Sequence, residues 1–165
     1  MKKILLLLLL PFMALSCIKD KEKKGFELKV GDSIPQFSVV MNDGTQLNSS
    51  SLCEGISLIM FFNTNCPDCK STLPTVHQVY NGYSDKVSFA LISREQGNTE
   101  LAKYWQQNSY TIPYSGQPDR TVYNLFATSL IPRIYICKDG VIRYIYTDTP
   151  NPEYDSIVRD INSLL

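Results

Sequence analysis

The fold of this chain is decided by FFNTNCPDCK, residues 61–70, in which an apolar run ends in two cysteines separated by two residues. The preceding residues, 56–62, are almost continuously apolar and predict a central strand that is covered on both faces. A helix is expected to continue from the second cysteine. Two thiols placed where a strand gives way to a helix can close a small disulfide ring and reopen it, so the stretch indicates redox chemistry.

Cys66 is the predicted nucleophile. If it lies at the first turn of the helix, the unpaired backbone N–H groups and the positive end of the helix dipole stabilise its thiolate. Cys69 follows one turn later on the same face and can attack a mixed disulfide formed at Cys66, which releases the partner in reduced form. Cys69 is therefore the predicted resolving thiol.

The two residues between the cysteines are expected to tune the motif. Pro67 suits the first helical turn, where a missing N–H costs nothing. Asp68 favours the start of the helix but places a negative charge beside the thiolate. We therefore expect Asp68 to lower the fraction of Cys66 that is ionised.

The same cysteine spacing also forms half of a tetrahedral zinc site, which needs two further ligands. The chain offers one histidine, His77, and two scattered cysteines, Cys53 and Cys137, with no second close pair. We therefore predict no metal and no other cofactor. His77 lies roughly 16 Å along the helix from Cys66, too far to act as a base. Cys53 and Cys137 are expected to be small buried residues, with a second disulfide or a relay thiol as the open alternative.

Residues 1–16 are predicted to form a secretory signal peptide. Lys2 and Lys3 precede an apolar run that is too short to span a bilayer as a mature helix. The run ends in ALSC, residues 14–17, which resembles the lipobox of bacterial lipoproteins, although Ala14 replaces the usual larger aliphatic residue. Cys17 is the expected lipidation site, and an ordinary signal peptide with a free Cys17 is the alternative.

Residues 17–29 are predicted to be the lipidated cysteine and a flexible tether, because residues 18–29 are rich in charge and have no apolar period. Removal of residues 1–16 would leave 14 basic and 16 acidic side chains, a balance that gives no reason to expect a nucleic-acid partner. Residues 30–165 have the length of one compact domain. Export also suits the cysteines, because disulfides persist outside the cytosol.

The order of predicted elements is a βαβ unit followed by a ββα unit, which gives an α/β domain with a mixed sheet. Residues 37–47 predict a hairpin around Asp43-Gly44, and residues 49–54 a short helical turn. Strands are also predicted after this hairpin, at residues 56–62, 86–93, 133–137 and 141–146. Helices are predicted after Cys66 as far as residue 83, with Pro74 inside, and at residues 99–108, 118–126 and 152–164.

These features together resemble the thioredoxin fold, a three-layer α/β/α arrangement, over residues 30–165. The start, VGDSIPQF at residues 30–37 with Asp43-Gly44, resembles the N-terminal hairpin extension of the TlpA-like and redoxin (AhpC/TSA) branch. The resemblance implies that Pro132 is a cis proline beside the disulfide. It also implies that Ile131 offers its backbone groups to an extended partner peptide, so these two residues are the expected substrate-binding pair.

Three positions depart from the pattern of this family. Asn65 replaces the tryptophan that usually precedes the first cysteine, and Met60 replaces a buried aspartate or another polar residue. Thr72 stands where many TlpA-like proteins have glutamate. No carboxylate is therefore evident to take the proton from Cys69, and either water or a residue brought in by the fold must do so.

The resemblance implies a membrane-tethered, extracytoplasmic thiol–disulfide oxidoreductase that exchanges the Cys66/Cys69 disulfide with exported proteins, as a reductant of these proteins or as a cytochrome-maturation factor. Its expected partners are protein thiols or disulfides of the cell envelope and an upstream membrane or periplasmic electron donor. Ile18, in place of an aspartate after Cys17, favours an anchor in the outer membrane facing the periplasm.

Two other function classes stay open. The first is a peroxiredoxin-type thiol peroxidase, for which Thr64 is present but no proline precedes Cys66 within residues 61–65. The second is a non-catalytic thioredoxin-like binding module, which is disfavoured because both thiols are intact.

Overall fold

A computed structural model describes residues 26–165 of the chain. The expected signal peptide and Cys17 lie outside the described residues. Within the described part, no helix combines the length and the apolar character that crossing a membrane requires.

A mixed five-stranded sheet forms the centre of the molecule, with strand order β5-β4-β3-β6-β7. Strand β3 lies between a parallel neighbour, β4, and an antiparallel neighbour, β6, and every one of its residues is buried because both faces of the sheet are covered here. This explains the almost unbroken apolar run in the sequence. The strands are β3 (Ile56–Phe62), β4 (Val87–Ser93), β5 (Tyr114–Ser115), β6 (Arg133–Lys138) and β7 (Val141–Tyr146).

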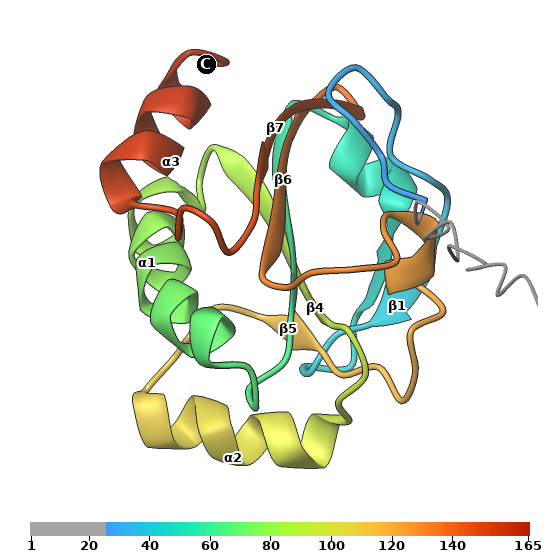
Figure 1. The fold of residues 1–165 in the computed structure, drawn as a ribbon, viewed down its shortest axis with the longest axis vertical. Helices are drawn as coiled ribbons and strands as arrows, with labels where there is room; N and C mark the ends of the chain where they lie inside the picture. Colours follow the sequence, from blue (N-terminus) through green and yellow to red (C-terminus); the bar gives the residue numbers. More distant parts are fainter. Residues whose placement is uncertain (1–25) are drawn as a thin grey trace, which may run out of the picture.

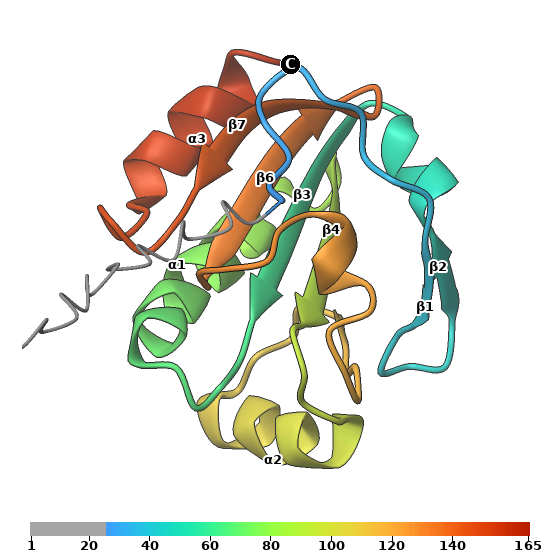
Figure 2. The ribbon, with the colours of Figure 1, turned by 45° about the vertical axis from the view of Figure 1, so that its right-hand side comes forward.

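Two helices, α1 (Pro67–Tyr83) and α3 (Tyr154–Asn162), lie together on one face of the sheet (Figure 1). The opposite face is covered by the N-terminal segment and two short 3₁₀ helices, η1 (Ser49–Cys53) and η2 (Tyr123–Leu125) (Figure 2). Helix α2 (Asn98–Asn108) packs Trp105 against Phe62, the last residue of β3. These contacts cover both faces of β3 and leave its C-terminal end to lead into α1.

The N-terminal extension is a separate two-stranded hairpin of β1 (Ser38–Val40) and β2 (Gln46–Asn48), as predicted. Gly44 has a φ of 85°, which glycine adopts readily, and the Asp43 side chain accepts hydrogen bonds from Thr45. The predicted α/β order is therefore confirmed, and Pro74 lies inside α1 as expected.

The structure differs from the prediction at two elements, a helix that is shorter than expected and a strand that was not expected. The helix expected at residues 118–126 is only the short η2, because the Asp119 side chain accepts the Thr121 backbone N–H and forms a local turn that competes with helix. Strand β5 was not predicted, because two residues are too few to show an alternating pattern.

The end of the predicted tether is part of the folded domain. Glu27 forms a bridge with Ala127, and the Leu28 N–H donates to Phe126 O at 2.8 Å. The boundary expected at residue 30 is therefore too late, and the structure places residues 26–28 against the segment that leads into β6.

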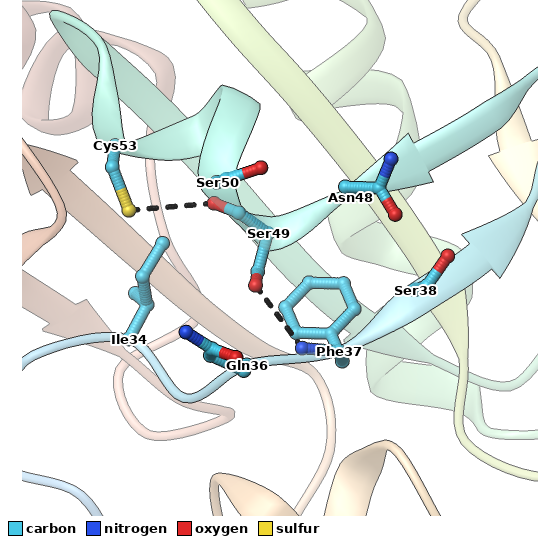
Figure 3. Close-up of a pocket in the computed structure, with 8 residues that line it drawn as sticks. All are labelled: Ile34, Gln36, Phe37, Ser38, Asn48, Ser49, Ser50 and Cys53. Atoms are coloured by element: carbon cyan, nitrogen blue, oxygen red, sulfur yellow. Dashed lines mark hydrogen bonds between the residues drawn. The ribbon is translucent and has the colours of Figure 1, made fainter.

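The two cysteines outside the motif differ in burial. Cys137 is fully buried in β6, as predicted, and burial raises the pKa of its thiol to about 12. The prediction is wrong for Cys53, which is exposed at the end of η1. Its Sγ points to Ser49 O, at 3.4 Å, beside a pocket of about 580 Å³ between η1 and the N-terminal segment (Figure 3). Both are free thiols in this structure.

Candidate active site

Cys66 occupies the N-cap position of α1, where an extended backbone turns into the helix. The Asn63 side chain accepts the Asn65 backbone N–H at 2.8 Å, and Asn63 O accepts the Cys66 N–H at 3.0 Å. These two bonds make the tight turn that carries the chain from β3 to α1. Cys66 is also partly exposed. A partner can therefore reach this cysteine at the helix N-terminus.

Cys69 is fully buried one turn further along α1. Burial raises the pKa of its thiol far above the ordinary range, and the neighbouring Cys66 raises it further. A hydrogen bond with the Asn63 backbone and the positive charge of Arg94 act in the opposite direction. The two thiols therefore differ as an attacking and a resolving thiol should, one accessible and the other kept protonated and protected.

The loop before β6 lies next to Cys66. The Cys66 Sγ is 3.6 Å from Ile131 O in this loop. The Ile131–Pro132 peptide bond is cis, as the resemblance implied. Both of these residues are buried, whereas the preceding Leu130 is half exposed. The structure thus brings Cys66, Cys69, Ile131 and Pro132 together at one edge of the sheet.

The remaining motif residues occupy the first turn of α1. Pro67 is the first helical residue, and Asp68 is exposed and acidic in that turn. Asp68 O accepts hydrogen bonds from the hydroxyls of Ser71 and Thr72. The position of Asp68 suits the expected effect on the Cys66 thiolate, which stays a prediction.

A buried polar pair supports the turn before Cys66 and was missed in the sequence. The backbone N–H and the hydroxyl of Thr64 both donate to Gln96 Oε1 at 2.9 Å. Gln96 follows the end of β4, the parallel neighbour of β3. The carboxyl ends of adjacent parallel strands meet at one edge, so this position was the signal that could have found it.

Other polar residues that the sequence singled out lie elsewhere or have different partners. His77 hydrogen-bonds with Thr111 and contacts the Tyr110 ring, away from the cysteine pair. The Thr72 hydroxyl reaches the Asn151 side chain at 2.7 Å. No group of three His, Cys, Asp or Glu residues in residues 26–165 is arranged to hold a metal ion.

Arg94 is the charged side chain that acts on Cys69. It forms an ion pair with Glu95, which also pairs with Arg120. The two arginines hold the pKa of Glu95 near 2, so this carboxylate stays ionised and is a poor proton acceptor. Among the described residues, Arg94 is therefore the charged side chain that shifts the Cys69 pKa, and the carboxylate paired with it is a poor proton acceptor.

Comparison with known proteins gives the family and the fold. The AhpC/TSA family model matches residues 30–145. No curated protein matches the sequence. A candidate protein disulfide isomerase from Bacteroides thetaiotaomicron has TM-score 0.79 and 21% identity, over 86% of this chain and 93% of that one.

Two further solved structures are similar. A thiol:disulfide interchange protein of the thioredoxin family from Chlorobium tepidum has TM-score 0.70 and 20% identity, over 81% of this chain and 96% of that one. A secreted disulfide oxidoreductase from Mycobacterium tuberculosis has TM-score 0.68 and 16% identity, over 78% and 96%. These similarities confirm the predicted thioredoxin fold.

Arg94→Gln is expected to slow the attack of Cys69 on a disulfide at Cys66, because it removes a charge that favours the Cys69 thiolate. The measurement uses a Cys53→Ser background, because the exposed Cys53 would also react with Ellman's reagent. In that background Cys66 should release the first thionitrobenzoate and Cys69 the second, so stopped-flow absorbance separates the two steps. We expect the second step to slow about three- to tenfold. In the wild type this step should also accelerate as pH rises above 7, because the Cys69 pKa is raised.

The matched control is Arg120→Gln, which loses the same charge and the same partner, Glu95, but is not among the groups that shift the Cys69 pKa. An equal slowing in both variants, or none in Arg94→Gln, would contradict this role of Arg94.

Proposed function

The chain belongs to the AhpC/TSA family, and we propose that it is a thiol–disulfide oxidoreductase that reduces disulfides of exported proteins. The observation that carries this proposal is the geometry around Cys66. Cys66 is partly exposed at the N-terminus of α1, its sulfur is 3.6 Å from Ile131 O, and Cys69 is buried one turn away.

In the proposed reaction, the Cys66 thiolate attacks one sulfur of a partner disulfide and the other sulfur leaves as a thiolate. The Cys69 thiol then loses its proton to water and attacks Cys66. A Cys66–Cys69 disulfide forms, and the partner leaves with both of its sulfurs reduced. An upstream donor dithiol in the membrane or periplasm must then return two electrons to the pair.

A peptide partner can be held by the backbone beside the cysteines. Ile131 precedes the cis proline, and its carbonyl faces the Cys66 sulfur. An extended peptide that pairs with backbone groups here would bring its disulfide to Cys66 whatever its side chains. This supports a protein disulfide as the substrate and Ile131-Pro132 as the substrate-binding pair.

The two other function classes receive less support. The Thr64 hydroxyl, the candidate peroxide-binding group, is buried and already bonded to Gln96. A non-catalytic binding module would not need an accessible thiol at a helix N-terminus with a second thiol behind it.

Insulin reduction by dithiothreitol tests the proposed activity. The wild type should accelerate insulin precipitation about tenfold or more over dithiothreitol alone and should consume hydrogen peroxide no faster than a control thiol. Cys66→Ser should abolish the acceleration, whereas Cys69→Ser should accumulate a mixed disulfide with the partner. Cys53→Ser, which removes the exposed cysteine of η1, should leave the rate unchanged. Acceleration that survives Cys66→Ser would refute the proposal.

We also propose that the protein is anchored by lipid at Cys17 in the outer membrane, facing the periplasm. The basic and apolar start of the chain and the ALSC stretch support this placement. Mass spectrometry of the purified membrane fraction should find an N-terminal peptide that begins with acylated Cys17. A mature chain that is soluble and unacylated would contradict the anchor.

A further inference from the structure

The loop that leads to the cis proline, residues 129–132, is held by side chains that lie outside it. Its Leu130 has a φ of 68°, in the left-handed region that a residue with a branched side chain adopts only when other contacts enforce it. The Tyr123 hydroxyl lies 2.6 Å from Ser129 O and 2.8 Å from Leu130 O. One hydroxyl thus holds two successive carbonyls just before Ile131.

Arg133, the residue after the cis proline, forms a second contact with the same loop from the start of β6. Its side chain is only 3% exposed, and its Nη2 donates to Ser129 O and to Glu27 Oε1, each at 3.0 Å. Its Nε has no hydrogen-bond partner. The buried guanidinium charge is therefore stabilised by few contacts, those with Glu27 and Ser129. A buried cation that loses its counter-charge is strongly destabilised where it lies, and Glu27 is the carboxylate paired with it.

Glu27 contacts the loop in a second way. The Ser129 hydroxyl donates to the same oxygen, Glu27 Oε1, at 3.1 Å. The backbone on either side of Glu27 is also attached to the loop, since the Leu28 N–H donates to Phe126 O and the Thr128 hydroxyl to Phe26 O. Glu27 therefore lies at the centre of a small cluster that joins the N-terminal segment to residues 126–133.

We propose that Glu27 and Arg133 are positioning residues that fix the loop at residues 129–132 so that Ile131 presents its backbone to a disulfide-bonded peptide beside Cys66. This inference rests on the proposed oxidoreductase function. It extends the substrate site to the segment around Glu27, which precedes the thioredoxin fold in the sequence. The chain of contacts runs from Glu27 through Arg133 and Ser129 to Ile131, whose carbonyl lies 3.6 Å from the Cys66 sulfur.

The proposal separates two kinds of substrate. A peptide that pairs with the loop needs the loop in place, whereas a small aromatic disulfide such as Ellman's reagent needs only the accessible Cys66 thiolate. Loss of the carboxylate should therefore weaken peptide binding and leave the reaction of the thiol itself unchanged. A general loss of structure would lower both.

The experiment compares Glu27→Gln with Asp32→Asn, a matched control that removes an acidic group from the same segment without touching the loop. Within the described residues, the Asp32 side chain accepts only the nearby Lys29 N–H, and the backbone bonds of Asp32 to Lys29 and Ile142 stay in the variant. For Glu27→Gln we expect KM for a disulfide-bonded peptide, with dithiothreitol as reductant, to rise about five- to tenfold, with kcat and the first thionitrobenzoate release within about twofold of wild type. Asp32→Asn should match the wild type, and Glu27→Asp should restore part of the affinity.

Three results would overturn the inference: an unchanged KM in Glu27→Gln, a KM change matched by Asp32→Asn, or an equal loss in the Ellman reaction. If Glu27→Gln is not folded at the assay temperature, Ser129→Ala carries the test. It removes one hydrogen bond to the same carboxylate and should raise KM about twofold, and an unchanged KM there also contradicts the proposal. A wild type that shows no peptide reduction at all would instead refute the proposed function.

Discussion

The contact between the Cys66 sulfur and Ile131 O, 3.6 Å apart, joins two parts of the chain separated by 65 residues, and the candidate site depends on it. The central sheet makes the contact possible. Because β3 pairs with β6 so that Phe61 lies opposite Arg133, the end of one strand and the start of the other meet at the same edge. The turn after β3 then delivers the helix N-terminus, and the loop before β6 delivers the cis proline.

The second constraint is the difference between the two thiols. One helical turn separates them, yet Cys66 is partly exposed and Cys69 is fully buried. Burial keeps Cys69 protonated until a disulfide forms next to it, while Cys66 lies at the N-cap of α1, where a partner can reach it. Arg94 is the charged side chain that lowers the Cys69 pKa, and its partner Glu95 stays ionised, so Arg94 favours the Cys69 thiolate directly.

Much of this arrangement could be predicted from local patterns. The apolar run of β3, the cysteine pair and the Asp43-Gly44 turn each carry a strong local signal, and they gave the order of elements. The pairs that support the site carry none, because Thr64–Gln96 and Glu27–Arg133 join residues that only the fold brings together. Charge composition also placed the predicted end of the tether too late in the chain, because Glu27 is charged and yet forms an ion pair with a buried arginine. Sequence patterns indicate the type of environment a residue prefers, and they do not identify its partner.

Competitive alkylation of the reduced, native protein tests the central claim most directly. Iodoacetamide at neutral pH, followed by peptide mass spectrometry, reports the rate at each cysteine. Cys66 should react faster than Cys53, which is exposed but lacks a position at the N-terminus of an α-helix, and Cys69 should stay unlabelled until the protein is unfolded. Labelling of Cys69 as fast as that of Cys66 would contradict the assignment of an attacking and a resolving thiol.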